Sequence, residues 1–328
     1  MTLCTLFNVN YLDKGIVLYE SLEKISDDFT LYVLAMDDKC YEILLDLNYK
    51  YLVPIKLKDF EDDELLRVKP HRSLGEYCWT CSSSLIRYVL ITFQPEYCTY
   101  IDADLYFYSN PQIIIDEMKA KNASVQVVGH RFNKKNKEYQ EWLVGKYCVE
   151  FNTFKNDENG LMLINKWRNQ CLDHCSTDGD GVYWGDQKYL DKWVEDYEFV
   201  IETENLGAGI APWNVMQYKR KNGKLYCNDL PIELIFYHFE NIQYLSRNKV
   251  KTNIQNIIRT DFKLIKDLYI DYLQKIDSIK TLLKAKYGID IVIKYHPGTR
   301  KDAQIVHLST WVEYLKDLLL TNCYVIKY

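Results

Sequence analysis

The stretch Tyr97–Pro111, which reads YCTYIDADLYFYSNP, places two acidic residues directly after an apolar strand. Residues 97–101 are mostly β-branched or aromatic, which favours a strand. Asp102 and Asp104 follow, and because side chains alternate along an extended chain, the two carboxylates point to the same side. Ligands of open α/β sheets bind at the carboxyl ends of strands, where paired carboxylates favour a hard divalent cation. The alternative is an acidic strand end that only begins a turn.

The segments before this stretch alternate between strand and helix patterns. Apolar strands are expected over residues 2–9, 30–36 and 52–57, and helices over residues 11–25 and 40–47. Alternation with short connections predicts a mostly parallel, doubly wound α/β sheet with helices on its faces. Farther along, the charged stretch of residues 133–141 predicts an exposed loop that closes over a ligand.

The Asp-Ala-Asp motif, its preceding strand and the following Asn110-Pro111 resemble the metal-binding motif of GT-A glycosyltransferases. The resemblance is closest to the family 8-like retaining transferases related to glycogenin and to bacterial lipooligosaccharide galactosyltransferases. It implies a GT-A fold, which is Rossmann-like with a mostly parallel central sheet flanked by helices. It further implies Mn²⁺ or Mg²⁺, a nucleotide-diphosphate sugar as donor, expected to be a UDP-sugar, and a glycan or lipid-linked acceptor in bacterial surface polysaccharide synthesis.

The same resemblance implies specific metal-binding and catalytic residues. Asp102, Asp104 and His238, which ends the apolar run Ile235–Phe239, are expected to hold the metal. An imidazole suits a borderline ion such as Mn²⁺. Asp186 and Gln187, which follow a glycine, match the pair that lies beside the anomeric carbon of the donor. The alternatives are a structural histidine and an aspartate that only caps a helix over residues 186–193.

The resemblance also implies a donor-binding set spread along the chain. It consists of Phe7, Asn8, Asn10, Tyr11, Arg87, Asp102, Ala103, Asn152, Gly207, Trp213 and Arg247. Asn10-Tyr11 matches the family pair that lines the base pocket, and Arg87 is expected to offset the charge of the acidic motif and to approach the donor phosphates. This sequence departs from the family after Asn152, where TFKNDENG replaces Asn-Ala-Gly.

The ten cysteines offer two other readings of the chain. Without a recognisable signal segment, reduced and mostly buried thiols are expected. Cys78 and Cys81 also fit a thiol redox motif, or half of a zinc site completed by Cys171, His174 and Cys175. A zinc-stapled binding protein without enzymatic activity is therefore one alternative function. A nucleotidyltransferase that makes nucleotide sugars is another, although the glycine-rich loop expected near its first strand is absent.

Composition and charge set the remaining expectations. A net charge of −5 argues against a nucleic-acid partner. Residues 1–248 are expected to form the catalytic domain, with a nucleotide-binding half over 1–111 and a sugar and acceptor half over 112–248. Residues 249–328 are expected to form a mainly helical extension. Residues 251–328 contain 13 Lys and Arg against 8 Asp and Glu, so this extension either contacts the inner membrane peripherally or packs on the catalytic domain. A cytoplasmic protein is expected, and the oligomeric state is left open.

Overall fold

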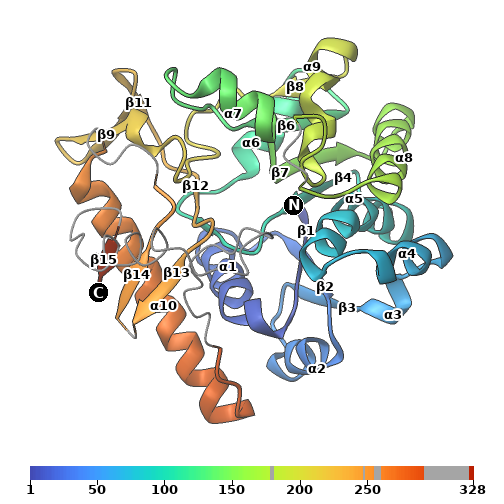
Figure 1. The fold of residues 1–328 in the computed structure, drawn as a ribbon, viewed down its shortest axis with the longest axis horizontal. Coiled ribbons are helices and arrows are strands. Elements are labelled where there is room, and N and C mark those ends of the chain that lie inside the picture. The colour runs from blue at the N-terminus through green and yellow to red at the C-terminus, as the bar shows by residue number, and fades with distance from the viewer. Residues whose placement is uncertain (178–180, 247, 255–259, 292–324) are drawn as a thin grey trace, which may run out of the picture. The chain divides into compact units, whose positions relative to one another are not determined.

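The computed structural model describes residues 1–177, 181–246, 248–254, 260–291 and 325–328. These residues form two compact units (Figure 1). Unit 1 contains Met1–Ile210 and Leu234–His238, and unit 2 contains Ala211–Glu233 and Phe239–Tyr328. The catalytic domain was expected to include residues 211–233 and 239–248. In the structure these residues group with the C-terminal part of the chain.

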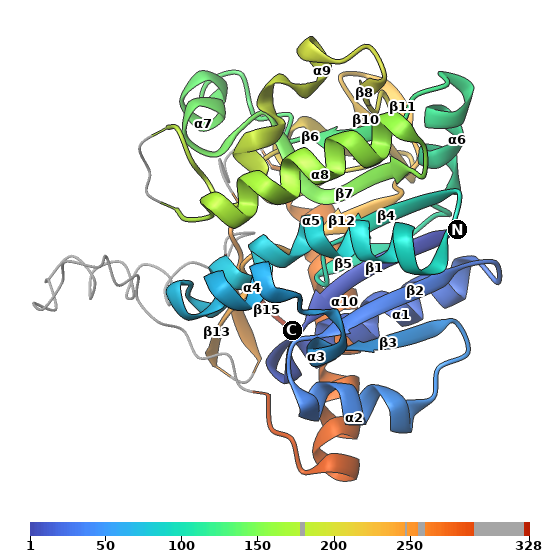
Figure 2. The same cartoon turned by 90° about the vertical axis from the view of Figure 1, so that its right-hand side faces the viewer.

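Unit 1 is built on a seven-stranded sheet in the order β3-β2-β1-β4-β7-β6-β8. Figure 2 shows this order from β8 near the top to β3 near the bottom. Only β7 runs against its neighbours β4 and β6, whereas the β1–β2, β2–β3, β1–β4 and β6–β8 pairs are parallel. The mostly parallel α/β sheet expected from the alternating pattern is confirmed. The strands are β1 (Thr2–Phe7), β2 (Thr30–Ala35), β3 (Leu52–Lys56), β4 (Tyr97–Ile101), β6 (Val125–Gly129), β7 (Tyr147–Lys155) and β8 (Val200–Glu202).

Two short strands extend unit 1 beside this sheet. β5 (Leu105–Phe107) follows the acidic motif and pairs in antiparallel fashion with β12 (Phe236–His238). The register sets His238 opposite Leu105. This pairing brings a late segment of the chain to the Asp102–Asp104 motif.

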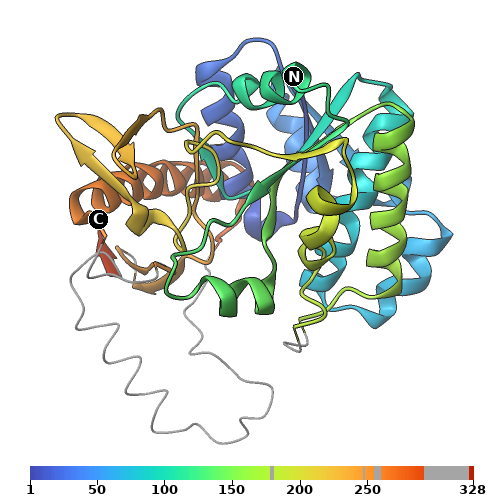
Figure 3. The same cartoon turned by 90° about the horizontal axis from the view of Figure 1, so that it is seen from above.

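The helices of unit 1 cover both faces of the sheet. α5 and α8 lie side by side on one face, and α1 lies on the other (Figures 1 and 3). The helices are α1 (Leu12–Ile25), α2 (Asp38–Leu47), α3 (Leu57–Phe60), α4 (Asp63–Val68), α5 (Leu74–Phe93), α6 (Gln112–Ala120), α7 (Lys137–Val144), α8 (Glu158–Asp173) and α9 (Trp193–Asp196), with the 3-10 turns η1 (Val9–Tyr11), η2 (Lys69–His71) and η3 (Gln187–Lys192). The prediction of a loop over residues 133–141 is wrong from Lys137 onward, because α7 begins there.

Packing and capping explain how α1 and α5 are fixed. A Cβ on Gly15 would lie 2.3 Å from the Phe7 ring, so only glycine lets α1 approach β1 this closely. Helix α5 begins with a capping box, in which the Ser73 hydroxyl accepts from the Glu76 N–H and the Glu76 carboxylate accepts from the Ser73 N–H. Gly15 thus sets how closely α1 packs on β1, and the capping box sets where α5 begins.

Unit 2 contains two small sheets and one long helix. β9 (Tyr218–Lys221), β10 (Lys224–Cys227) and β11 (Leu230–Ile232) form one sheet, preceded by η4 (Val215–Gln217), and β13 (Gln243–Ser246), β14 (Lys249–Lys251) and β15 (Val325–Lys327) form the other. α10 (Phe262–Tyr287) is a long helix within the extension that was expected to be mainly helical. Residues 292–324 of that extension lie outside the described residues. Within the described part of the chain, no helix has the length and apolar character needed to cross a bilayer.

Candidate active site

Three predicted ligands meet at the end of β4. Asp102 follows the strand, Asp104 precedes β5, and His238 ends the partner strand β12. His238 Nε2 lies 3.0 Å from Asp104 Oδ1 and 3.7 Å from Asp102 Oδ2. One donor atom from each residue lies within 4.8 Å of the others. The chain thus brings together two carboxylates and an imidazole from positions more than a hundred residues apart.

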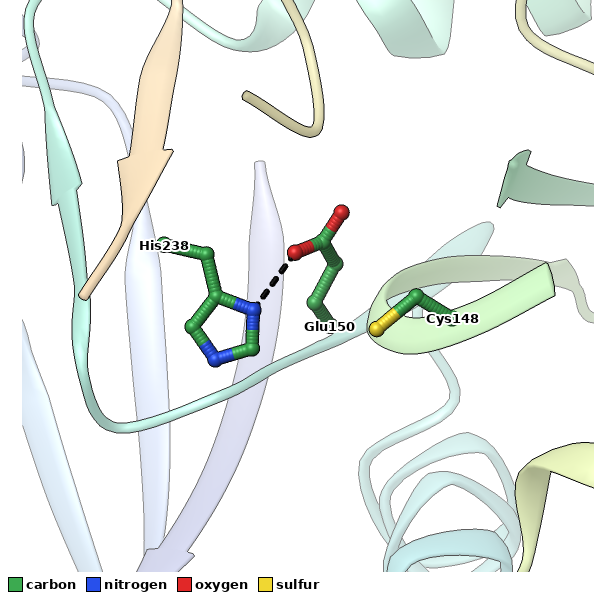
Figure 4. Close-up of side chains that lie close together, drawn as sticks. All are labelled: Cys148, Glu150 and His238. Carbon is green, nitrogen blue, oxygen red and sulfur yellow. Dashed lines mark hydrogen bonds and ion pairs between the residues drawn. The ribbon is translucent and has the colours of Figure 1, made fainter. Parts of the chain in front are cut away.

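Behind His238 lies a buried carboxylate that the sequence analysis missed. Glu150 projects from β7, is fully buried, and its Oε2 lies 2.6 Å from His238 Nδ1 (Figure 4). Cys148, two residues earlier on the same strand, is also buried next to His238. A carboxylate on Nδ1 fixes the imidazole tautomer and leaves Nε2 to face the aspartates. The available signal was a lone glutamate inside the apolar strand YCVEF, because buried charges are rarely unpaired.

The three ligands differ in their protonation. Burial raises the pKa of Asp102 to about 7, against the opposing charge of His238. Burial also favours a higher pKa for Asp104, but the positive charges of His238 and Lys14 outweigh it and lower the pKa of that carboxyl to about 2. For His238, burial favours the neutral ring, yet Asp104 and Glu150 raise its pKa well above the usual value. The cluster therefore lacks the positive charge needed to ionise both aspartates fully near neutral pH.

The cation beside the acidic motif is Lys14 rather than Arg87. Lys14 Nζ, on the buried side of α1, lies 3.9 Å from Asp104 Oδ2 and 3.7 Å from the centre of the Tyr11 ring. Burial would lower the pKa of Lys14, but Tyr11 and Asp104 raise it. The prediction that Arg87 lies beside the two aspartates is wrong, because its Nε donates to Asn165 Oδ1 on α8 at 2.7 Å. Arg87 therefore faces the neighbouring helix and not the carboxylates.

Asp186 is buried and does not cap the turn that it precedes. Its carboxylate accepts a 2.5 Å hydrogen bond from the Ser82 hydroxyl on α5, and it makes no side-chain cap bond to η3. Burial, together with the charge of Asp102, raises the pKa of Asp186 to about 7, although the Ser82 hydrogen bond acts in the opposite direction. Gln187 uses its Nε2 to donate to the Val144 carbonyl at 2.7 Å, which ties η3 to the end of α7.

The end of β1 carries the residues expected to hold the base. Asn8 Oδ1 accepts from the Asn10 N–H, and Tyr11 is 38% exposed. Phe7 is buried against Gly15, so its ring supports α1. Asp37, which the sequence analysis did not single out, accepts from the Val9 N–H at 2.8 Å. Asn8, Asn10 and Tyr11 therefore form an ordered, accessible strand end, whereas Phe7 belongs to the core.

The other predicted donor-binding residues occupy different surroundings. Ala103 is buried between the two aspartates, and Asn152 is fully buried on β7 opposite Tyr100. The Gly207 carbonyl accepts from the Ile235 N–H and so anchors its loop at the start of β12. Trp213 is buried in unit 2, and Arg247 lies outside the described residues.

The chemistry of the donor atoms fits a divalent cation. Carboxylate oxygens with one imidazole nitrogen are ligands that Mn²⁺ accepts, and Mg²⁺ favours the same oxygens. Within the described residues, only two groups of side chains have this kind of spacing: Asp102–Asp104–His238 and Cys148–Glu150–His238. Neither includes the cysteines of the alternative zinc site, Cys78, Cys81, Cys171 and Cys175. Every cysteine that the structure describes is free, and all except Cys78 are buried, as expected for packed thiols.

The fold and the strand-end carboxylates define the class of this protein: it has the fold of the GT-A glycosyltransferases, as the sequence motif indicated. The structure of the galactosyltransferase LgtC in complex with donor and acceptor sugar analogues aligns with a TM-score of 0.52 and 11% identity, over 85% of this chain and 96% of that chain.

More specifically, the chain belongs to the family of two uncharacterized Bacillus subtilis (strain 168) proteins, YfnD and YfnF. It is 31% identical to YfnD over 274 residues, which cover 82% of this chain and 86% of YfnD. It is 32% identical to YfnF over 281 residues, which cover 83% and 91% of the respective chains. No family model matches the chain.

Proposed function

We propose that this protein is a metal-dependent glycosyltransferase. It moves a sugar from a nucleotide-diphosphate sugar, with a UDP-sugar as the expected donor, to a glycan or lipid-linked acceptor, with retention of anomeric configuration. The observation that carries the proposal is the meeting of Asp102, Asp104 and His238 at the carboxyl end of β4 within a GT-A fold. A role in bacterial surface polysaccharide synthesis at the cytoplasmic face of the membrane is part of the proposal.

The residues around the acidic motif bind and orient the donor. Asp102, Asp104 and His238 would hold Mn²⁺ or Mg²⁺, which when bound supplies positive charge to the diphosphate leaving group. Glu150 holds the His238 ring from behind, and Lys14 places a second positive charge beside Asp104. Four carboxylates lie in or beside this cluster, those of Asp102, Asp104, Glu150 and Asp186. A nucleoside diphosphate is therefore expected to bind weakly to the metal-free protein.

Asp186 acts on the sugar side of the reaction. The new bond forms between the acceptor hydroxyl oxygen and the anomeric carbon, while the bond from that carbon to the diphosphate oxygen breaks and the hydroxyl proton passes to the departing diphosphate. Positive charge develops at the anomeric carbon, and a fixed carboxylate in a site of low polarity stabilises it. The Ser82 hydrogen bond keeps the Asp186 carboxylate in one orientation. Gln187 is proposed to position the sugar through the turn that it shares with Asp186.

A donor-hydrolysis screen tests this proposal. The protein is incubated with UDP-, GDP-, CMP- and TDP-sugars, with Mn²⁺ or with a chelator. Metal-dependent release of free sugar from one donor class is expected. Release of pyrophosphate from a nucleoside triphosphate and a sugar phosphate would instead identify a nucleotidyltransferase. Tightly held zinc with no turnover would favour the binding-protein alternative.

Asp104→Ala tests the metal-binding residues directly. This change removes a buried ligand and leaves His238 Nε2 without its closest carboxylate, so we expect calorimetry to detect no binding of UDP with Mn²⁺. Asp229→Ala is the matched control, because Asp229 is exposed and pairs only at the surface with Lys221. Unchanged UDP affinity in Asp104→Ala would remove Asp104 from the metal site.

A further inference from the structure

Two tryptophan side chains of unit 1 are exposed, although tryptophan is usually buried. Trp79 is 39% exposed on α5, and Trp142 is 51% exposed on α7. Tyr139, one turn before Trp142, is 61% exposed, and their ring centres lie 6.0 Å apart. By contrast, Trp167 and Trp193 are buried in the core. Exposed aromatic groups of this size mark contact surfaces when they gather at one place.

Trp79 is linked to Asp186 through one hydroxyl group. Trp79 lies one helical turn before Ser82, and the Ser82 hydroxyl contacts both the Trp79 carbonyl oxygen at 2.8 Å and the Asp186 carboxylate. Gly185, which directly precedes Asp186, packs on the Trp79 ring, and a Cβ there would lie 3.4 Å from it. The Trp79 ring therefore packs against the residue that directly precedes the proposed catalytic Asp186.

Trp142 is linked to the same loop from α7. A Cβ on Gly181 would lie 2.3 Å from the Trp142 indole, so the backbone at Gly181 lies directly against that ring. The end of α7 is tied to η3 by two hydrogen bonds, from Gln187 Nε2 to the Val144 carbonyl and from Lys188 Nζ to the Glu141 carbonyl. In the loop over residues 181–185, Gly181 at the start therefore lies against Trp142, and Gly185 at the end lies against Trp79.

We propose that Trp79, Trp142 and Tyr139 form a saccharide-binding rim that holds the acceptor next to Asp186. This inference rests on the proposed glycosyltransferase function and names the chemical class of the acceptor as an oligosaccharide. One face of a sugar ring presents C–H groups, which pack on an aromatic ring while the hydroxyl groups stay in water. The rim follows the loop that leads to Asp186. This position favours the acceptor sugar as the molecule that binds there.

A membrane surface fits the rim less well. The sequence from Lys134 to Lys137 is basic, but α7 also carries Glu138 and Glu141, and Lys137 pairs with Glu141 at 3.6 Å. Helices that lie on anionic membranes concentrate Lys and Arg on the polar face, whereas α7 carries both signs of charge. The two indoles also belong to different helices and flank a loop, which suits an extended chain of sugar rings.

Fluorine NMR of protein labelled with 5-fluorotryptophan tests the rim by direct binding. Resonances are assigned by single Trp→Phe changes, and the full-length protein with Mn²⁺ and UDP is titrated with lactose, maltotriose, xylotriose and chitotriose. We expect the Trp79 and Trp142 resonances to shift with at least one of these sugars, while that of the buried Trp193 stays fixed. The absence of any shift at Trp79 and Trp142 overturns the rim, even if the protein hydrolyses a donor.

Kinetics provide the second measurement. For the oligosaccharide that binds, Trp142→Ala and Trp79→Ala should each raise the KM for that acceptor, and lower the ratio of transfer to donor hydrolysis, by about tenfold. Ile113→Ala is the matched control, because Ile113 is 51% exposed on α6, a helix that carries none of the rim residues. An unchanged ratio in both tryptophan variants contradicts the proposal.

Two further outcomes separate the rim from the proposed function. If the wild-type protein hydrolyses no nucleotide sugar but the two resonances shift with an oligosaccharide, the glycosyltransferase proposal fails while the saccharide-binding surface stands. Vesicles of phosphatidylcholine and phosphatidylglycerol at 3:1 test the other occupant. If these vesicles broaden the Trp79 and Trp142 resonances and the sugars do not, the rim is a membrane contact and the acceptor assignment is wrong.

Discussion

At the scale of single residues, the candidate site depends on how His238 is held. Its Nδ1 lies against Glu150 and its Nε2 against Asp104, so both ring nitrogens are oriented by carboxylates. The resemblance to GT-A enzymes identified His238 and the two aspartates. It could not identify Glu150. The antiparallel β4–β7 pairing brings β7 to His238, and the register of that pairing is set only in the folded sheet.

We expect Glu150→Gln to lower the affinity for Mn²⁺ by about 10-fold to 100-fold, which is typical for partners of metal-binding histidines. The change keeps the size of the side chain but removes the charge that orients the His238 ring. Electron paramagnetic resonance of free Mn²⁺ measures the affinity without turnover. Cys148→Ala is the control on the same strand, since it retains Glu150, and it should have the smaller effect. Wild-type Mn²⁺ affinity in Glu150→Gln would show that Glu150 only fills space.

At the scale of elements, α5 connects the core to Asp186. The helix carries Ser82 inward to Asp186, and the same hydroxyl contacts the Trp79 backbone. Arg87 is the residue of this helix that was expected at the site, but it lies five residues after Ser82 and faces α8. The sequence pattern did not predict which polar residue of α5 turns toward the strand ends, because α8 packs against the same helix.

We expect Asp186→Asn to bind UDP with Mn²⁺ normally and to lose sugar transfer by at least about tenfold, or roughly 1.4 kcal/mol of barrier. A group that acts mainly in the transition state changes turnover more than affinity. Transfer rates and UDP affinity of the same preparation measure this difference. Near-wild-type transfer would remove Asp186 from the catalytic residues.

The pH dependence of stability gives Asp186→Asn a second readout. The folded protein holds the pKa of Asp186 at about 7, whereas an unfolded aspartate titrates near 3.9. Between these values the folded state binds the extra proton, so this group makes the protein less stable as pH rises. We therefore expect Asp186→Asn to raise Tm relative to wild type at pH 8 in a chelator, and much less at pH 5. A Tm difference that does not change with pH would contradict the buried carboxylate.

At the scale of the whole molecule, sequence patterns predicted the parallel part of the fold well. The strands from β1 to β4 and their helices follow the expected alternation, and the GT-A motif marked the strand end where Asp102, Asp104 and His238 come together. The grouping of residues 211–233 with the C-terminal part was not predicted. Those residues contain three short strands, and the pairing of short strands depends on distant partners more than on local pattern. Lys14 was missed because it lies within an otherwise ordinary amphipathic helix.

The chain leaves the site directly into the core of unit 2. Phe239 follows His238 and belongs to unit 2, where its ring stacks on Tyr272 of α10 with centres 3.8 Å apart and also contacts Tyr269. Helix α10 buries one apolar side along its length, including Leu268, Leu273 and Ile276. Unit 2 therefore needs α10 to form its core.

We expect removal of residues 251–328 to abolish Mn²⁺ binding, because the truncated chain would expose Phe239 immediately beside His238. Tyr272→Ala is the graded form of the same change. It should lower the free energy of unfolding by about 3–5 kcal/mol, the usual cost of truncating a buried aromatic side chain. Lys284→Ala, which removes only a surface ion pair on α10, should change it by less than about 1 kcal/mol. Denaturant unfolding and Mn²⁺ titration measure both effects. A soluble truncated protein with wild-type Mn²⁺ affinity would mean that unit 1 folds and binds its metal without α10.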